Sequence, residues 1–471
     1  MDTIDVIIIG SGIAGLSAAL SATENGARTV VVFEADTEIG GASRLSGGII
    51  MGAGYGLQRE AGVEDSAESF YRDYMNANVW NLNPAAVKAF CDESGPTIDW
   101  LVGHGVRFHP DLIFGGAENT PRCVAAVGQG GQIVNGLARK VRQAGVDIAV
   151  DHRVERILFE DGRAVGVVVG GEEIRSASVV IASGGYGANR ELLAEHNPSW
   201  TATGDWGWYI GTGTAQGDAF GFAEQLGARI DGHDRGLRLL HPGFVRTFES
   251  YIPGWMVLVN KEGRRFVDES SAYGVLDRTT HSNGGVAWFV FDHQAVDRST
   301  AGNTKAYKQV MPEREDRQSP NWNPAMIAEQ VEAGRIHSAG TVAQLAVKAG
   351  LPVDQLQATV EAYNDGDHDA FGKDAQFVRP ITEGPFYAAE VRLATLCWTG
   401  VGPAVTGRGE VMDTLGRPIP GAYACGEVTG GVLGDVYVGS GNSVGNSATF
   451  GRIAGRNAAL SIAGVPAATS A

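Results

Sequence analysis

The sequence predicts an α/β fold built on a parallel sheet. Three short apolar runs, at residues 6–9, 179–182 and 422–425, each lead within two residues into glycine. Uninterrupted apolar runs of this length are typical of central parallel strands that are buried on both faces. The 67 glycines among 471 residues are close to twice the usual share of about 7%, and many of them follow these runs. Glycine belongs where the backbone turns tightly or approaches a ligand closely.

The composition limits the class of protein. Hydrophobic residues make up 44% of the chain and charged residues 19%, so the chain can bury a large core. At roughly 100–200 residues per domain, we expect two to three domains. Only 17 prolines accompany the glycines, and no Gly-X-Y period runs through the chain. Collagen and Pro/Gly-rich disorder are therefore excluded.

The charge balance predicts which partners the protein lacks. The chain has 37 Lys and Arg against 54 Asp and Glu, which gives a net charge of −17. This charge repels nucleic acid and anionic membrane surfaces, so we expect no nucleic-acid partner. The four cysteines and ten histidines show no metal-ligand spacing, which predicts no metal site and a reducing compartment.

The N-terminus and the most apolar segment predict the location. The first residues lack the basic region of a secretory signal. Residues 6–22 are the most apolar stretch, but they carry three glycines in a fixed pattern, which favours a buried strand, turn and helix over a membrane span. We expect a cytoplasmic protein with no integral membrane segment.

The first strand continues into a dinucleotide-binding fingerprint, Gly-Ser-Gly-Ile-Ala-Gly at residues 10–15. A helix over 16–24 follows it, and a second strand over 28–33 ends at Glu34. Gly10 permits the tight turn, Gly12 lets the backbone approach a pyrophosphate, and Gly15 lets helix and strand pack closely. The helix N-terminus faces the phosphates, and Glu34 can accept hydrogen bonds from a ribose diol. The segment predicts a Rossmann-like nucleotide-binding site, and we expect Ala14 to contact the cofactor there.

A second glycine-rich segment indicates which dinucleotide binds. Residues 40–48 read Gly-Gly-Ala-Ser-Arg-Leu-Ser-Gly-Gly and closely follow the second strand. A nicotinamide dehydrogenase has no obvious use for such a loop. In flavoproteins, a loop at this place runs along the pyrophosphate, ribityl chain and flavin ring. We therefore predict FAD as the cofactor, with contacts from Gly41, Ala42, Ser43, Ser46, Gly47 and Gly48.

Four further strands are predicted to join this nucleotide-binding unit. Residues 146–155 are predicted to form a strand at the far side of the nucleotide, which brings Val154 to the site. Residues 160–163 form a hairpin turn between strands over 156–159 and 164–169. The strand at 179–182 brings Ala182 and Gly184 to the site.

The C-terminal third supplies another glycine-rich loop. Residues 422–428 are predicted to contain a strand that ends at Gly426 and Glu427, and a helix follows over 446–462 with Ala and Gly on one face. The N-terminus of a helix carries a partial positive charge, which would stabilise a reduced flavin. We expect Asn442, Ser443 and Val444, in the approach to this helix, to contact the cofactor.

Four segments together resemble the flavoproteins of the fumarate reductase and 3-ketosteroid dehydrogenase superfamily. They read GSGIAG, GGASRLSGG, GRRFVDESSAY and GEVTGG…GSGNSVGN. The resemblance covers nearly the whole chain. It implies a Rossmann-like FAD-binding domain with an inserted α+β domain that caps the substrate. The insertion would run over residues 233–396, which leaves 1–232 and 397–471 as the two parts of the FAD-binding domain.

Two places in the sequence separate the branches of this superfamily. Fumarate reductases carry a catalytic arginine at the fourth position after the Glu of an R-F-x-N-E segment, where this chain has Tyr273. They also carry a His and an Arg near the terminal Gly-Glu loop, and residues 431–437 contain neither. A dicarboxylate site without arginine forks lacks its main binding interaction. Fumarate reductase chemistry is therefore disfavoured, although Arg278 keeps an alkene reductase as an alternative.

The 3-ketosteroid dehydrogenases are similar to this chain in two respects. They carry a tyrosine at the place of Tyr273, and their terminal Tyr-Pro-Gly-x-Gly stretch has the spacing of residues 437–441, with Val438 here in place of proline. The resemblance implies that Tyr437 O–H and Gly441 N–H hold the substrate ketone oxygen as an oxyanion hole. It also implies that Tyr273 removes the α-proton while hydride passes from the β-carbon to flavin N5, which yields an α,β-unsaturated ketone.

The sequence leaves parts of this hypothesis open. A tyrosine base has a reference pKa of about 10, and Δ1-ketosteroid dehydrogenases have an assisting tyrosine, for which Tyr55, Tyr186 and Tyr209 are candidates. The leading substrates are 3-ketosteroids. The alternative is a smaller cyclic ketone such as a cyclohexanone or 4-oxocyclohexanecarboxylate, whose carboxylate would need Arg278 or Arg122. The electron acceptor is open between a quinone, a protein and oxygen.

Overall fold

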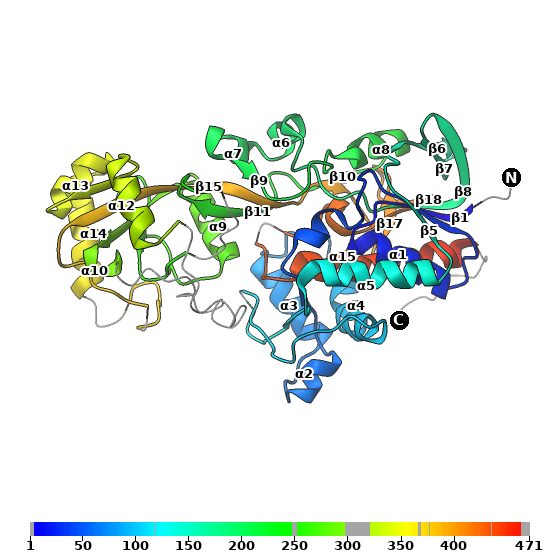
Figure 1. Ribbon diagram of the computed structural model, residues 1–471, viewed down its shortest axis with the longest axis horizontal. Coiled ribbons are helices and arrows are strands. Elements are labelled where there is room, and N and C mark those ends of the chain that lie inside the picture. Colours follow the sequence, from blue (N-terminus) through cyan, green and yellow to red (C-terminus); the bar gives the residue numbers. More distant parts are fainter. Residues whose placement is uncertain are drawn as a thin grey trace.

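The computed structural model describes residues 4–116, 118–246, 252–296, 321–365, 369–375, 377–434 and 436–462. They form two large sheets that lie side by side along the long axis of the molecule, and the long strand β15 (Phe386–Thr399) runs from one unit toward the other (Figure 1). The described residues begin in β1 and end in α15, both in the unit of the first sheet, and helices α2 (Gly56–Glu60), α3 (Ala67–Ala77) and α4 (Pro84–Gly103) extend from one side of the same unit.

The first sheet is the parallel sheet that the sequence predicts. Its strands run in the order β17-β18-β8-β1-β2-β5, and the neighbours from β18 to β5 are all parallel. Residues 6–9 of the central strand β1 are at most 4% exposed, as the apolar run predicts. The strands are β1 (Ile4–Ile9), β2 (Val30–Phe33), β5 (Asp147–Ala149), β8 (Glu172–Ile181), β17 (Glu410–Met412) and β18 (Pro418–Ala424).

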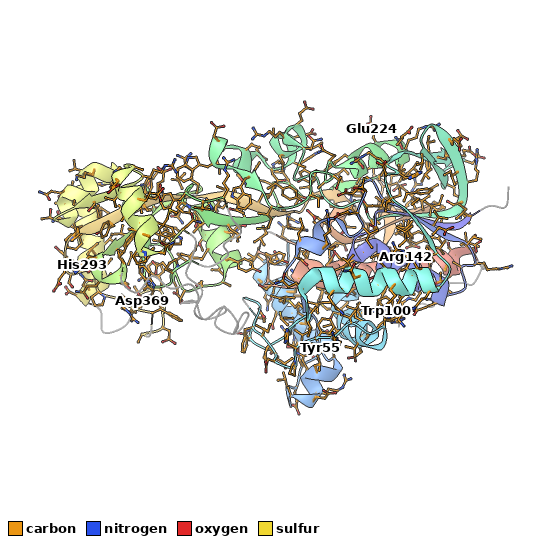
Figure 2. All side chains as sticks on the ribbon, in the orientation of Figure 1. Tyr55, Trp100, Arg142, Glu224, His293 and Asp369 are labelled. Carbon is orange, nitrogen blue, oxygen red and sulfur yellow. The ribbon has the colours of Figure 1, made fainter. Side chains whose placement is uncertain are left out.

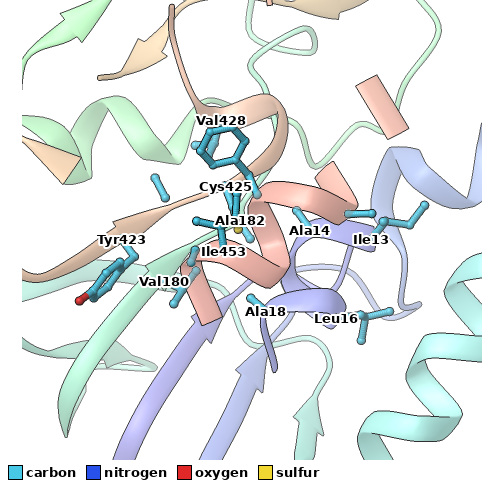
Figure 3. Close-up of a cluster of buried hydrophobic side chains, with 14 of the residues drawn as sticks. Ile13, Ala14, Leu16, Ala18, Val180, Ala182, Tyr423, Cys425, Val428 and Ile453 are labelled. Atoms are coloured by element: carbon cyan, nitrogen blue, oxygen red, sulfur yellow. The ribbon is translucent and has the colours of Figure 1, made fainter. Parts of the chain in front are cut away.

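Two helices pack against this sheet and against each other. α1 (Ile13–Glu24) and α15 (Asn442–Ile462) lie together, and Figure 3 shows the apolar side chains between them and the strands. Their close contact needs glycine, since a Cβ on Gly451 or Gly455 would lie 2.4 or 2.1 Å from the carbonyl oxygen of Ala14 or Ala18. The Ala- and Gly-rich face of the last helix is therefore its packing face. The helix begins at Asn442, four residues before the predicted start at 446.

The predicted hairpin is present, and the strand predicted over 146–155 is wrong in one respect. β6 (Val154–Glu160) and β7 (Arg163–Val169) pair antiparallel, and β7 continues onto β8. Residues 146–155 form two strands, β5 and the start of β6, rather than one. Asp151, between them, has φ +59°, which an extended strand does not tolerate.

The segment from 41 to 143 forms the flank of this unit. Two short strands pair antiparallel there, and Figure 1 shows helices α3 and α4 beside α15. The side chains of Ser66 and Asn83 accept hydrogen bonds from the first turns of α3 and α4 at 3.1 and 3.2 Å, which explains where these helices begin. The elements are the 3-10 helix Gly41–Leu45, β3 (Ile49–Met51), α2 (Gly56–Glu60), α3 (Ala67–Ala77), α4 (Pro84–Gly103), β4 (Cys123–Ala125) and α5 (Gln129–Gln143).

The second sheet is organised around β15. Strands β11, β13 and β14 pair antiparallel with β15, β12 pairs with β13, and the short strand β9 runs parallel to β15. The strands are β9 (Trp208–Tyr209), β11 (Gly236–His241), β12 (Val257–Val259), β13 (Val286–Asp292) and β14 (Ile336–Ala339), and the helices of this unit are α9 (Tyr273–Ser282), α10 (His293–Val296), α12 (Pro324–Glu332), α13 (Val342–Ala349) and α14 (Val353–Asp365).

A buried ion-pair network fixes the segment that leads to α9. Glu269 is fully buried and accepts hydrogen bonds from Arg265 at 2.8 Å and from Lys373 at 2.9 Å. Arg265 also pairs with Asp369, which Figure 2 labels in the second unit. Removing one partner of such a network leaves an uncompensated buried charge, so the network holds the chain four residues before Tyr273 in one conformation.

The second sheet gathers strands from residues 208 to 399, whereas the predicted insertion runs over 233–396. β9 begins before residue 233, and β15 passes residue 396. The division into 1–232, 233–396 and 397–471 stays a prediction. The remaining connecting elements are α6 (Arg190–His196), α7 (Pro198–Thr201), the 3-10 helix Gly204–Trp206, α8 (Asp218–Leu226), β10 (Ile230–Asp231), β16 (Gly402–Pro403) and the 3-10 helix Gly426–Val428.

Two kinds of feature are absent from the described residues. No described helix combines the length and the apolar character that crossing a bilayer requires. Likewise, nowhere in the described ranges do three or more His, Cys, Asp or Glu side chains gather as metal ligands would.

Candidate active site

A cavity of about 400 Å³ lies between the two sheets. One wall is formed by the carboxyl ends of β1, β2, β8 and β18 together with residues 41–49 and the start of α15. The other wall comes from β9, β11, α9 and the end of β15. Ligands of open α/β sheets bind outside the carboxyl ends of the strands, where this cavity lies.

The fingerprint loop is held at one end of the cavity by a network around Glu34. The Glu34 carboxylate accepts hydrogen bonds from Ser11 N at 2.8 Å, from Ser11 Oγ at 2.5 Å and from Asp36 N at 2.9 Å. Ser43 Oγ accepts a hydrogen bond from Ile13 N at 3.1 Å, which ties residues 41–45 to the first turn of α1. The α1 N-terminus and an acidic side chain therefore share one wall, as a site for pyrophosphate and ribose requires.

The backbone faces open space at two places along this wall. Gly41 (φ +48°) and Gly184 (φ +79°) line the cavity, and no atom lies within 4 Å of the position that a Cβ would take on either residue. At the far side, Ser443 and Val444 bring the N-terminal turn of α15, with its partial positive charge, to the cavity. These features fit FAD: the α1 N-terminus would hold its pyrophosphate, and the α15 N-terminus would favour negative charge on the reduced flavin.

The structure brings most of the predicted cofactor-binding residues to this cavity. Those that line it are Gly10, Gly12, Ala14, Glu34, Gly41, Ala42, Ser43, Ser46, Gly47, Gly48, Val154, Ala182, Gly184, Glu427, Ser443 and Val444. Their contact with the cofactor stays a prediction.

Three predicted residues, Gly15, Gly426 and Asn442, do not line the cavity. A Cβ on Gly15 would lie 1.9 Å from Gly10 O, so this glycine allows the close packing for which the fingerprint selects it. A Cβ on Gly426 would lie 2.8 Å from the Cβ of Ala14. The Asn442 side chain is fully buried and pairs with a tyrosine of α3.

The two tyrosines predicted to be catalytic lie together at the other end of the cavity. Tyr273, the first residue of α9, is 8% exposed, and its hydroxyl lies 2.9 Å from Ser440 Oγ. The ring centroids of Tyr273 and Tyr437 are 6.0 Å apart. Tyr437 Oη accepts a hydrogen bond from Ser443 N at 2.8 Å, so its own proton can be donated to a ligand. Burial raises the pKa of Tyr437 well above its ordinary value, which keeps the hydroxyl protonated.

Gly441, the third residue predicted to be catalytic, lies beside Tyr437 in the cavity wall. Its φ is +86°, and a Cβ would lie 2.8–3.0 Å from the backbone of Ile49 and Ile50 in β3. Within the described part of the chain, no group accepts a hydrogen bond from the Gly441 N–H. Backbone geometry at this position therefore depends on glycine, and no described group occupies its N–H.

Glu427 faces the same cavity from the end of β18. Its carboxylate accepts hydrogen bonds from Thr399 N at 3.0 Å and from Thr399 Oγ1 at 2.9 Å, which connects it to the end of β15. Burial raises its pKa from the ordinary 4.5 to about 7. Burial therefore favours the protonated form of this carboxyl group over a wider pH range than in an exposed glutamate.

The described part of the cavity wall offers no cation to a carboxylate substrate. No Arg or Lys occurs among the described residues that line it. Arg122 is fully buried and donates to Asp65 at 2.7 and 2.9 Å and to Asp73 at 2.6 Å, so its guanidinium is already committed. Arg278 lies on α9 but does not line the cavity.

Of the candidates for an assisting tyrosine, Tyr209 lines the cavity. Its hydroxyl is buried and meets no hydrogen-bond partner among the described atoms. Tyr186 donates its hydroxyl to Asn197, and Tyr55 lies near α2 (Figure 2); neither lines the cavity.

Sequence reasoning missed four residues at the catalytic end: Ser440, Leu237, Leu239 and Trp398. Ser440 occupies the variable position of the Tyr-Pro-Gly-x-Gly pattern, and its hydroxyl contact with Tyr273 could not be read from spacing. The two leucines alternate along β11, so a strand pattern of period two could have placed them on one face. No signal marks Trp398.

Comparison with known proteins identifies the family. The model of the FAD binding domain family matches residues 5–444 of this chain. The chain belongs to this family. It is 30% identical to a cytochrome-type fumarate reductase of Shewanella frigidimarina over 483 residues, which cover 97% of this chain and 77% of that protein. It is also 30% identical to an NADH:fumarate oxidoreductase of Klebsiella pneumoniae. That match covers 97% of this chain but only 47% of the relative's length.

Solved structures that resemble this chain include a 3-ketosteroid dehydrogenase. The 3-ketosteroid-Δ4-(5α)-dehydrogenase of Rhodococcus jostii, in complex with 4-androstene-3,17-dione, superposes with a TM-score of 0.78 at 28% identity and covers 97% of this chain and 96% of that one. The protein is therefore an FAD-dependent oxidoreductase that acts on carbon–carbon bonds, and the predicted cofactor and enzyme class are confirmed.

Proposed function

We propose that the protein desaturates a cyclic ketone next to its carbonyl, with 3-ketosteroids as the leading substrates. The observation that carries this proposal is the catalytic end of the cavity. Two buried tyrosines lie there with their ring centroids 6.0 Å apart, Gly441 lines the same cavity, and the described lining contains no Arg or Lys. Such a set of neutral donors suits a ketone oxygen and offers little to a dicarboxylate.

The ketone oxygen accepts hydrogen bonds from Tyr437 O–H and Gly441 N–H. The Tyr437 oxygen accepts a hydrogen bond from Ser443 N–H, and its own hydroxyl proton is donated to the ketone. Both donors act on the negative charge that develops on oxygen as the α-carbon loses its proton. Removing one donor of this kind typically costs about 10²–10³ in kcat.

Tyr273 removes the α-proton. Two features of its surroundings stabilise the phenolate that a tyrosine base requires. Ser440 Oγ, 2.9 Å away, can donate to the Tyr273 oxygen, and the N-terminus of α9, where Tyr273 is the first residue, favours negative charge. FAD, when bound, supplies the acceptor for the hydride that leaves the β-carbon.

The walls of the catalytic end suit an apolar ring. Leu237 and Leu239 of β11 and Trp398 of β15 line the cavity beside the tyrosines, and the rings of Trp398 and Tyr437 are 6.3 Å apart. These side chains exclude water from the reacting carbon atoms, which strengthens the hydrogen bonds to the ketone oxygen.

A second candidate is the reduction of an activated alkene. Relatives named fumarate reductase are 30% identical over 97% of this chain, which supports this alternative. The same side chains serve both directions, because Tyr273 would then donate a proton to the α-carbon. The direction depends on whether the redox partner withdraws or supplies electrons.

Anaerobic mixing of the purified holoprotein with a panel of compounds tests the proposal. We expect 5α-androstane-3,17-dione to bleach the flavin absorbance. If only cyclohexanone or 4-oxocyclohexanecarboxylate bleaches it, the substrate is the smaller ring. If no ketone reduces the flavin, but fumarate re-oxidises the dithionite-reduced protein, the enzyme is an alkene reductase and the proposal is wrong.

A further inference from the structure

The loop of residues 436–441, which carries Tyr437 and Gly441, is attached at both ends to one helix. That helix is α3, which lies beside α15 in Figure 1. Two residues one turn apart make these contacts: Tyr74 on α3, and Asn78, the C-cap residue directly after α3; they are 0% and 3% exposed. No part of the chemistry proposed above uses either residue.

Asn78 holds the first end of the loop. Its Oδ1 accepts a hydrogen bond from Val436 N at 3.0 Å, and its Nδ2 donates to Val436 O at 3.2 Å. The side-chain amide thus pairs with both backbone groups of the residue before Tyr437, as a neighbouring strand would. Asn78 Nδ2 also lies 3.2 Å from Tyr74 O, which fixes the amide on its own helix.

Tyr74 holds the second end. Its hydroxyl donates to Asn442 Oδ1 at 3.2 Å and accepts from Asn442 Nδ2 at 2.9 Å. Asn442 follows Gly441 directly and is the first residue of α15. The Tyr74 ring packs edge-on against Phe70 and Phe90, with centroids 5.8 Å away in each case, so the hydroxyl has a fixed position.

Gly434, two residues before Val436, also packs closely against Asn78. A Cβ on Gly434 would lie 1.9 Å from Asn78 Oδ1, so only glycine lets the chain approach Asn78. Directly after Asn78, Val79 and Trp80 have φ +45° and +59°, a conformation that costs a β-branched residue stability. The chain keeps this strained turn at the point where the helix contacts the loop.

We propose that Tyr74 and Asn78 are positioning residues that set the distance between the Tyr437 hydroxyl and the Gly441 N–H. This inference rests on the proposed function, since it assigns these two donors to the ketone oxygen. An oxyanion hole works only when both donors are already aimed at the oxygen before reaction, and a misplacement of about 1 Å can cost about 10²-fold in rate.

The test compares four variants of the holoprotein. Asn78→Ala removes both bonds to Val436, and Tyr74→Phe removes only the hydroxyl. Their matched controls lie on the same helix: Asn76→Ala, an exposed amide that bonds to Trp80 Nε1, and Tyr71→Phe, whose ring contacts Trp80. The FAD content and Tm of each variant are measured first. Asn78→Asp, which keeps the acceptor for Val436 N, replaces Asn78→Ala if that variant does not fold.

Amide hydrogen exchange gives a readout that does not depend on turnover. We expect Asn78→Ala and Tyr74→Phe to speed exchange in the peptide that contains Val436 and Ser443 by about tenfold, while the controls match the wild type. With 5α-androstane-3,17-dione, kcat should fall about 10–100-fold and KM change by less than about threefold, because misplaced donors weaken transition-state binding most.

The outcomes separate the two hypotheses. Unchanged exchange in the loop, or faster exchange with unchanged kcat, overturns the positioning role. Equal effects in the controls also overturn it. If the wild-type enzyme oxidises no ketone, the proposed function fails, and the exchange data still show whether α3 holds the loop.

Discussion

Replacing Tyr437 by phenylalanine removes one donor of the proposed oxyanion hole and keeps the ring. The hydroxyl accepts from Ser443 N at 2.8 Å, and the side chain is 8% exposed. Loss of one oxyanion donor typically costs about 10²–10³ in kcat, or about 2.7–4 kcal/mol. The stability cost should be about 1–3 kcal/mol, because a single N–H group, that of Ser443 in the first turn of α15, loses its partner.

The assay is stopped-flow reduction of the flavin by ketone without oxygen, which isolates the half-reaction from the electron acceptor. For Tyr437→Phe we expect the limiting rate to fall by about 10²–10³, with FAD content unchanged. A rise in the apparent ketone Kd with the limiting rate preserved would refute the reasoning. It would mean that the hydroxyl binds substrate and transition state equally.

Three further predictions concern the walls of the cavity. Gly441→Ala places a Cβ 2.8 Å from Ile50 C, which displaces the loop backbone. We therefore expect the limiting rate of flavin reduction to fall about 10²-fold or more while FAD stays bound. A rate within threefold of the wild type would exclude the Gly441 N–H as a donor. Burial raises the pKa of Glu427 to about 7, so between pH 4.5 and 7 the folded flavin-free protein keeps a proton that the unfolded chain releases. The free energy of unfolding should therefore fall by at most about 3 kcal/mol as pH rises from 4.5 to 7. Glu427→Gln should flatten that slope in urea unfolding, and an unchanged slope would contradict the assignment. Glu34→Ala should weaken FAD binding about 10–100-fold in a fluorescence titration, and an unchanged Kd would exclude Glu34 from the nucleotide site.

The nucleotide end of the cavity could be predicted from the sequence because its signals are local. Gly10, Gly12 and Glu34 lie within 25 residues of one another, and their spacing reflects one strand, one turn and one helix. The observed wall has these residues in that arrangement. Backbone geometry dictated by glycine is visible in the sequence itself.

The catalytic end could be predicted only through a resemblance. Tyr273 and Tyr437 are 164 positions apart in the chain, and no propensity or periodicity brings their rings to 6.0 Å. The contact of Tyr273 with Ser440 likewise arises from the packing of α9 against the terminal loop. Such pairs depend on tertiary structure, so the sequence alone could not place them.

Two boundaries of the predicted elements are wrong, and contacts distant in sequence explain both: Asp151 N donates to Asp36 O at 2.9 Å, and Asn442 pairs with Tyr74. The break between β5 and β6 depends on Asp151, whose φ is +59°. Neither neighbour of Asp151 is a glycine, so the sequence does not indicate this backbone conformation. The last helix begins at Asn442 rather than 446, since the buried pairing of Asn442 with Tyr74 holds it in the first turn. Tertiary contacts decided both boundaries.

The central claim is that Tyr273 removes the α-proton of a ketone, and anaerobic flavin bleaching in Tyr273→Phe tests it most directly. The variant should bind FAD as the wild type does and keep the ring that packs 6.0 Å from Tyr437. Loss of a general base typically costs about 10²–10⁴ in rate, so bleaching by 5α-androstane-3,17-dione should slow at least a hundredfold. Bleaching of Tyr273→Phe at the wild-type rate would contradict the claim.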